Sequence, residues 1–174
     1  MKLIITNKIE SLNLDSLMEV YAESNRENLE KFAYKNLDDL ENAYKEYLSK
    51  DFLNNKDNYL AILSDGKNYL SALRLHREDG GYLIEAIETR EDSRKKGYGF
   101  KLLSLVVDWT CEDLYLRSEV GEDNIKSIGL HKKLGFVEKE KIGKSFVFIR
   151  YGQKKKAILK TEAGNTFLGD LPLS

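Results

Sequence analysis

A short glycine-containing segment has the residue types that could bind an anion. It spans residues 94–99, with the sequence RKKGYG, between a predicted strand and a predicted helix. Glycine lets the backbone turn sharply and approach a ligand closely, and the free N–H groups at a helix start favour a phosphate, which the three basic side chains would also attract. The pattern is neither a Walker loop, since no Gly-Lys-Ser/Thr follows, nor a dinucleotide fingerprint, since Leu102 replaces the third glycine. The segment is therefore a candidate phosphate-binding turn, with a plain structural turn as the alternative.

Two carboxylates lie in the apolar run just before this turn. Glu85 and Glu88 belong to residues 82–89, which are otherwise mostly apolar. Because they are three positions apart, a regular strand would point them to opposite faces of its sheet. A half-buried carboxylate can have a raised pKa and act as a general base. Each acid could instead reach solvent or pair with Arg74 or Arg117.

Three polar residues share one face of a later predicted helix. Asn124, Ser127 and His131 stand at positions i, i+3 and i+7 of the segment NIKSIGLHKKLGF. Such a stripe is a candidate ligand-facing surface. A buried structural histidine is the alternative for His131.

The elements that must position these groups follow from hydrophobic periodicity and turn signals. Asn13 is a plausible cap for the first helix, and Asp65-Gly66 predicts a hairpin. The expected strands span residues 3–5, 59–63, 68–76, 82–89, 114–118, 136–137 and 145–151, and the expected helices span residues 14–21, 37–52, 100–109 and 124–134.

This order predicts an α/β (α+β) fold. Residues 59–89 form an antiparallel meander, and a strand–helix–strand unit follows it, so the central sheet should be mixed, mostly antiparallel and six- to seven-stranded. Helices are expected on both faces. One domain should cover residues 1–151, and residues 152–174 should form a C-terminal tail or an extra edge strand. A basic cluster at 154–156 in that tail is expected to be solvated.

Composition excludes several classes of protein. The chain has 174 residues and one cysteine, Cys111, so it cannot form an intrachain disulfide, and a reducing, cytoplasmic location is expected. It has no apolar run of about 18 residues and no signal-peptide pattern, so no membrane association is expected. The net charge of −1 argues against a generally basic nucleic-acid binder.

The charges are unevenly distributed along the chain. Residues 1–93 hold 12 Lys and Arg against 19 Asp and Glu, whereas residues 94–174 hold 16 against 10. The acidic half, which includes Glu23, Glu27 and Glu30, would suit a cationic amine, and the basic half would suit an anion. Chance partition of solvated charges is the alternative.

The two motifs, in this order and context, resemble the GNAT superfamily of acyl-CoA N-acyltransferases. RKKGYG is similar to the family signature Q/R-x-x-G-x-G/A. The segment from Asn124 to Phe136 is similar to the family pattern N-x-x-A-x-x-L-Y-x-K-x-G-F. The expected element order over residues 1–151 also agrees with the family fold.

The resemblance implies roles for particular residues. Backbone groups of Ile87, Glu88 and Thr89 would pair with the pantetheine arm of the coenzyme. The turn formed by Arg94, Lys95, Lys96, Gly97, Tyr98 and Gly99 would hold the pyrophosphate. Asn124, with Ser127 and His131 on the same helix face, would contact the coenzyme. Ser127 replaces the usual alanine, and His131 stands where the family commonly has a tyrosine that protonates the departing thiolate. Glu85 is the first choice as general base and Glu88 the second.

The implied activity is transfer of an acetyl group from acetyl-CoA to a primary amine by direct attack. It needs no metal and no covalent enzyme intermediate. The acceptor would be a small-molecule amine or a peptide or protein amine, and the resemblance leaves room for a homodimer, which an edge strand at 157–161 could build. The alternative is a non-catalytic acyl-CoA-binding or sensing domain on the same fold. An interaction module that uses the tail is a third reading.

Overall fold

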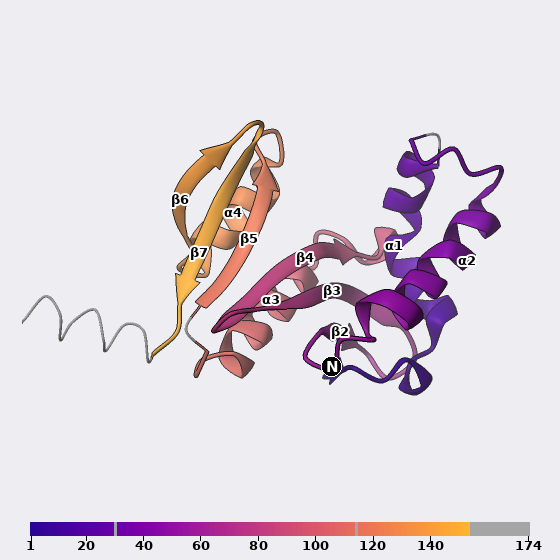
Figure 1. Ribbon diagram of the computed structural model, residues 1–174, viewed down its shortest axis with the longest axis horizontal. Coiled ribbons are helices and arrows are strands. Elements are labelled where there is room, and N and C mark those ends of the chain that lie inside the picture. Colours follow the sequence, from indigo (N-terminus) through magenta and orange to yellow (C-terminus); the bar gives the residue numbers. More distant parts are fainter. Residues whose placement is uncertain (30, 114, 154–174) are drawn as a thin grey trace, which may run out of the picture. The chain divides into compact units, whose positions relative to one another are not determined.

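The computed structural model describes residues 1–29, 31–113 and 115–153 (Figure 1). Its strands are β1 (Lys2–Thr6), β2 (Tyr59–Ser64), β3 (Tyr69–Glu78), β4 (Gly81–Thr89), β5 (Tyr115–Gly121), β6 (Val137–Ile142) and β7 (Ser145–Tyr151). Its helices are α1 (Leu14–Asn28), α2 (Leu37–Tyr47), α3 (Tyr98–Trp109) and α4 (Ile125–Lys133), with short turns η1 (Ile9–Ser11), η2 (Leu48–Phe52) and η3 (Glu91–Ser93). None of the described helices is long and apolar enough to cross a membrane.

The strands form one mixed seven-stranded sheet in the order β1-β2-β3-β4-β5-β7-β6. The pairs β1–β2, β2–β3, β5–β7 and β6–β7 are antiparallel. The α/β fold class and the strand number expected from the sequence are therefore confirmed. Residue contacts divide the chain into two compact units, Met1–Arg77 with Leu83–Val106, and Glu78–Tyr82 with Val107–Ser174.

Asparagine side chains start three of the helices. Asn13 Oδ1 accepts the Ser16 N–H at 3.0 Å at the start of α1, as the sequence predicts. Asn36 and Asn124 cap α2 and α4 in the same way. Helix α1 continues seven residues past the predicted end at Tyr21. The second half of the helix is polar, so it lacks the apolar periodicity from which the prediction was made.

One face of the first unit's sheet packs against α1 and η2. Alternation along β2 places Leu60 and Ile62 on this face, and Ala72 of β3 lies opposite Ile62. All three are fully buried. They form a hydrophobic cluster with residues of α1 and η2, namely Leu17, Met18, Val20, Tyr21, Leu48 and Phe52. This cluster holds α1 against the sheet.

The other face of the same strands lies against the start of α3. Ser71, which pairs with Leu63 on this face, has its hydroxyl 3.1 Å from Thr89 Oγ1. A Cβ at Gly99 of α3 would lie 3.2 Å from that same Thr89 oxygen. Leu102 and Leu103 of α3 are fully buried. Helices therefore cover both faces of the sheet in this unit, as the sequence predicts.

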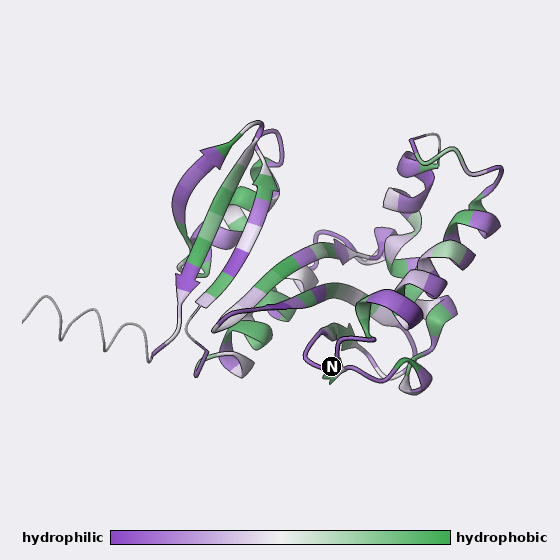
Figure 2. Ribbon diagram, in the orientation of Figure 1, coloured by the Kyte–Doolittle hydropathy of each residue, from purple (hydrophilic) through white to green (hydrophobic). Residues whose placement is uncertain are grey.

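The second unit is built on β5, β7 and β6 with α4 beside them (Figure 1). Strand β7 is mostly apolar, whereas the middle of β6 is hydrophilic (Figure 2), and every residue of β6 is exposed. The chain after β7 passes close to the segment that follows α3. A Cβ at Gly152 would lie 1.8 Å from the Asp113 carbonyl oxygen, so only glycine fits there. The predicted edge strand at 157–161 lies outside the described residues.

Candidate active site

Strand β4 is continuous but irregular in its middle, at Ala86. This residue has a φ of +48°, in the left-handed region that costs an L-residue about 1–2 kcal/mol. Glu85, just before it, lies 3.5 Å from Arg74, whose cross-strand neighbour Leu60 faces α1. Glu88, just after it, interacts electrostatically with Glu23 of α1. Both carboxylates therefore lie on the α1 side of the sheet.

The expectation that Glu85 and Glu88 point to opposite faces is wrong. It assumed a regular strand, in which positions three apart alternate. The left-handed residue acts as a bulge, which adds one position and restores both acids to the same face. The strand thus presents two carboxylates to the same helix.

Glu88 is the carboxylate that the surroundings leave available. Burial raises its pKa above the usual value, and the nearby carboxylates of Glu23 and Glu27 raise it further, while Arg94 opposes them. Among the described residues, no side chain forms a hydrogen bond or ion pair with this carboxylate. Its backbone oxygen accepts a 2.5 Å hydrogen bond from Ser71 Oγ, which fixes the strand there. A half-buried, unpaired carboxyl with a raised pKa can accept a proton near neutral pH.

Glu85 is held by an aromatic-bound arginine. The Arg74 guanidinium lies over the rings of Tyr44, Tyr47 and Phe52 at 5.5–5.7 Å. Its Nη1 donates to the Tyr44 hydroxyl at 2.9 Å, and its Nε faces Glu85 Oε2 at 3.5 Å. Pairing with Arg74 was one of the alternatives that the sequence left open. Arg117, the other candidate partner, pairs with Glu78 and Glu119 in the second unit.

The basic turn connects β4 to α3. It follows η3 and has two left-handed residues, Lys95 with φ +61° and Gly97 with φ +78°. The first helical hydrogen bond of α3 runs from the Lys101 N–H to the Gly97 oxygen at 3.0 Å, so the N–H groups before it are directed out of the helix. Tyr98 and Gly99 form the first residues of α3.

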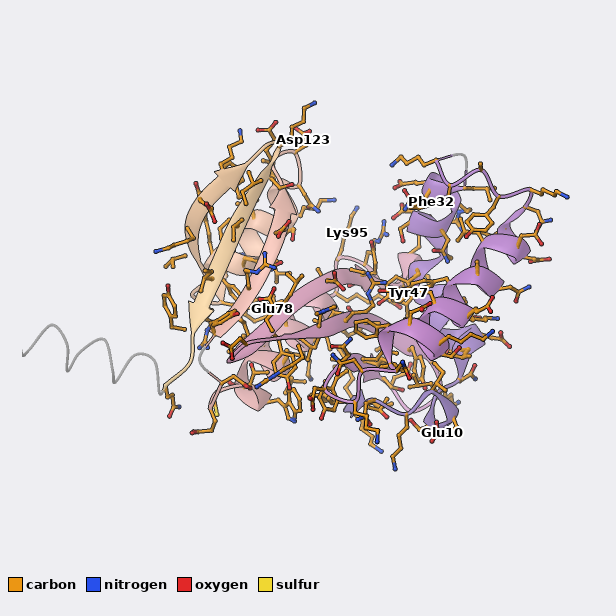
Figure 3. The ribbon with its side chains drawn as sticks, viewed as in Figure 1. Glu10, Phe32, Tyr47, Glu78, Lys95 and Asp123 are labelled. Carbon is orange, nitrogen blue, oxygen red and sulfur yellow. The ribbon has the colours of Figure 1, made fainter. Side chains whose placement is uncertain are left out.

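This turn has room for a phosphate. A Cβ at Gly97 would meet no atom within 4 Å, so the space beside its backbone is open. The side chains of Lys95 and Lys96 are exposed, and Lys95 stands away from the ribbon in Figure 3. Unpaired helix-start N–H groups, open space and exposed cations are the features that bind an anion. The turn therefore fits the phosphate group expected from the sequence.

Three ion pairs join α1 to the segment between β4 and α3, and one of them reaches the basic turn itself. The Arg94 guanidinium pairs with Glu23, and its Nε donates to the Thr89 oxygen at 3.2 Å. The other two pairs join Arg90 to Glu19 and Arg26 to Glu91, each at 2.7 Å. Arg94 is thus already shared between a carboxylate of α1 and the end of β4. Ile87 and Thr89, the other backbone candidates, lie half-buried in the last three residues of β4.

A cavity of about 490 Å³ opens between α1, α2 and the middle of the sheet. Its walls combine five aromatic residues and three aliphatic residues with one arginine and three polar residues of α1. They are formed by Tyr21, Ser24, Asn25, Asn28, Phe32, Tyr34, Leu40, Ala43, Tyr44, Tyr47, Arg74 and Ala86. Phe32, in the loop after α1, and Tyr47, at the end of α2, are labelled in Figure 3. Sequence reasoning missed this site, because Tyr44 and Tyr47 fit the apolar spacing of a packed helix face and give no other signal.

Asn124, Ser127 and His131 interact with one another within the second unit. The Ser127 N–H donates to Asn124 Oδ1 at 3.1 Å, and His131 Nδ1 donates to the Ser127 oxygen at 2.8 Å. These two local hydrogen bonds explain why the three polar residues share one helix face. Their part in coenzyme binding stays a prediction.

His131 is fully buried. Its ring lies between Phe136, at 5.0 Å, and Phe148, at 5.7 Å between ring centres. Burial lowers its pKa, so the neutral imidazole is favoured, and its Nε2 has no hydrogen-bond partner among the described residues. These contacts agree with the structural alternative for His131.

The sequence matches the model of a known protein family. Residues 14–136 match the model of the acetyltransferase (GNAT) family. None of the curated proteins matches the chain.

Several solved structures share the fold. PaiA N-acetyltransferase from Thermoplasma acidophilum, in complex with coenzyme A, is 19% identical with a TM-score of 0.63, over 87% of this chain and 99% of that one. PH1933 from Pyrococcus horikoshii is 22% identical with a TM-score of 0.63 and the same coverage. A mutant of the spermidine N-acetyltransferase SpeG from Vibrio cholerae is 14% identical with a TM-score of 0.61, over 88% of this chain and 95% of that one.

Proposed function

This chain belongs to the acetyltransferase (GNAT) family, and on that premise we propose that it transfers an acetyl group from acetyl-CoA to a primary amine of a small acceptor. The observation that carries this proposal is the course of β4. The strand borders an aromatic cavity at Ala86, presents an available carboxylate at Glu88, and leads directly into the basic turn. The expected positions of the acceptor, the base and the phosphate thus follow one another along β4 and the segment after it.

The coenzyme would be held mainly by backbone groups. The N–H groups of residues 95–99 are suited to its pyrophosphate, because the Arg94 N–H already donates to the Glu91 oxygen, and the exposed Lys95 and Lys96 add positive charge. Backbone groups of Ile87, Glu88 and Thr89 would pair with the pantetheine arm. When bound, acetyl-CoA supplies the thioester carbonyl that the amine attacks.

Glu88 is the base in this proposal, ahead of Glu85. An amine is protonated at neutral pH and must lose a proton before it can attack a carbonyl carbon. Glu88 accepts that proton, directly or through a water molecule, because its raised pKa brings it closer to the working pH. The ion pair with Arg74 engages Glu85 and makes it the weaker candidate. The backbone N–H near Ile87 would polarise the carbonyl oxygen.

The proton for the departing thiolate was assigned to His131 from the family pattern. That role requires a proton-bearing nitrogen that faces the sulfur. The Nδ1 proton of His131 is engaged by the Ser127 oxygen, and burial disfavours protonation of the ring. We therefore keep His131 as a packing residue in the proposal and test the assignment below.

Release of free thiol from acetyl-CoA in the presence of a panel of primary amines tests the proposal. Glu88→Gln should lower kcat by about 100-fold or more, the usual contribution of a general base. Glu85→Gln, a matched change on the same strand, should lower it by less than about 10-fold. Equal losses would contradict the choice of Glu88. Binding of acetyl-CoA with no turnover on any amine would favour the sensing domain instead.

A further inference from the structure

The walls of the aromatic cavity contain buried hydrogen-bond donors that have no partner. From them we infer that the acceptor is an amine with an apolar or aromatic body and an oxygen acceptor, a carboxylate above all, at its other end. This inference rests on the proposed function, because it assigns a substrate class to the same site.

Two residues of α1 provide these donors. Tyr21 is 2% exposed and Asn25 is 8% exposed, and both line the cavity. Neither the Tyr21 hydroxyl nor the Asn25 Nδ2 has a partner in hydrogen-bonding geometry, although Tyr44 interacts with the Tyr21 hydroxyl and contributes to the rise in its pKa. They stand four positions apart, so they share one face of the helix.

Buried polar groups in folded proteins are nearly always satisfied, because an unpaired donor loses its hydration without compensation. Burial also raises the pKa of Tyr21 well above its ordinary value, so the phenol keeps its proton and can donate. Two such donors on one wall are best satisfied by an oxygen atom of a ligand.

The charges of the lining residues also favour an acceptor that carries a carboxylate. None of the described residues that line the cavity is acidic, and Arg74 is the one cation among them. Its guanidinium is shared with Glu85 and Tyr44, which leaves this part of the wall close to neutral. A polyamine would therefore find no carboxylate partner on these walls. Glu23 and Glu27, from the acidic half of the chain, are not among the lining residues.

The remaining walls suit a flat apolar body. Tyr21 and Tyr44 meet edge to face at 5.4 Å, and Tyr44 stacks with Tyr47 at 6.2 Å. Aromatic rings in such arrangements bind planar groups by stacking and edge contacts. The cavity volume of about 490 Å³ is in the range of small-molecule sites.

Matched pairs of amines test this inference. The first pair is 4-(aminomethyl)benzoate and benzylamine, and the second is phenylalanine and phenethylamine, with spermidine as the polyamine. We expect at least one carboxylate amine to exceed its uncharged partner by about 10-fold or more in kcat/KM, and to exceed spermidine as well, because a site built to hydrogen-bond a group discriminates against analogues that lack it.

Variants of the two donors separate this effect from general damage. Asn25→Leu removes the amide at similar volume and should reduce that preference to about twofold or less. Tyr21→Phe should act in the same direction, and it provides a second test if Asn25→Leu fails to fold. Asn54→Leu, at an exposed asparagine in the loop after η2, is the control and should keep the preference.

The outcomes distinguish the two proposals. If acetyl-CoA binds but benzylamine, phenethylamine or spermidine is preferred, the inference is overturned and the proposed function stands. If acetyl-CoA binds and no amine of the panel is acetylated, the inference is also overturned. If acetyl-CoA itself does not bind, the proposed function is overturned, and the inference that rests on it is overturned as well. A preference for carboxylate amines that survives in both Asn25→Leu and Tyr21→Phe would overturn the assignment to α1.

Discussion

Three influences on its pKa meet at the carboxyl group of Glu88. Burial has the largest effect and raises the pKa, Arg94 lowers it, and the carboxylates of Glu23 and Glu27 raise it. The acid limb of the rate profile should therefore lie above the usual carboxyl value of 4.5, because Glu88 must be deprotonated to act as the base. Under the proposed function, Glu88 would set the lower pH boundary of the activity.

Removing one of the neighbouring charges should move that boundary. Glu23→Gln takes away a carboxylate that raises the pKa of Glu88 and also frees Arg94 from its ion pair, so the acid inflection of kcat/KM should shift to lower pH. The pH dependence of thiol release measures it. Glu10→Gln, an exposed acid outside this group, should leave the inflection unchanged. A shift to higher pH in Glu23→Gln would contradict this account of Glu88.

His131 makes a separate prediction about stability. Its pKa is lowered from 6.5 in the folded chain, so the unfolded chain binds the proton more tightly. Stability is therefore full above about pH 6.5 and is lost as the pH falls towards the depressed folded value. Between about pH 8 and pH 5.5, the urea midpoint of the wild type should fall more than that of His131→Phe.

The same variant tests the role assigned from the family pattern. A phenylalanine can still pack between Phe136 and Phe148, but it cannot donate a proton. We expect kcat to change by less than about threefold, because the ring is retained. A loss of about 100-fold in a variant that remains folded would show that His131 is the general acid after all.

At the scale of the element, the bulge in β4 decides how the site is arranged. Ala86 holds a left-handed conformation that a small residue tolerates and a β-branched residue strongly resists. Ala86→Val should therefore destabilise the fold by about 1–2 kcal/mol or more, and Ala86→Gly should change stability by less than about 1 kcal/mol. Denaturant unfolding measures both. Equal stability of the two variants would mean that β4 is regular at this position.

The elements themselves could largely be predicted from the sequence. Asn13 and Gly135 mark the start of α1 and the end of α4, and Asp65-Gly66 marks the β2–β3 turn, because caps and tight turns demand particular residue types. The bulge could not be predicted in this way. Alanine has no special preference for a left-handed conformation, so nothing in its residue type signals the irregularity at position 86.

At the scale of the whole molecule, the family and the sheet follow from the two motifs and the element order. The cavity does not, because it depends on which side chains of α1, α2 and β3 meet across the fold. Arg74, Tyr44 and Tyr21 are far apart in sequence and each fits a packed helix or strand position by itself. The choice of Glu88 over Glu85 likewise required the Arg74 contact, which no local pattern reveals.

The expected coenzyme contacts form two groups, the strand end with the basic turn, and Asn124 with its helix. The central claim concerns the first group, namely that the turn at residues 94–99 binds the phosphates of acyl-CoA. Every later step of the proposed reaction depends on it.

Calorimetric titration of the protein with acetyl-CoA and with CoA tests this claim most directly, with Gly97→Glu and Gly66→Glu as a matched pair. Both glycines have positive φ and open space at the Cβ position, so the two variants introduce the same charge and similar backbone strain at different turns. We predict micromolar binding in the wild type and in Gly66→Glu, and a loss of about 100-fold or more in Gly97→Glu, because a carboxylate would occupy the anion site. Undiminished binding in a folded Gly97→Glu, or no binding in the wild type, would contradict the account.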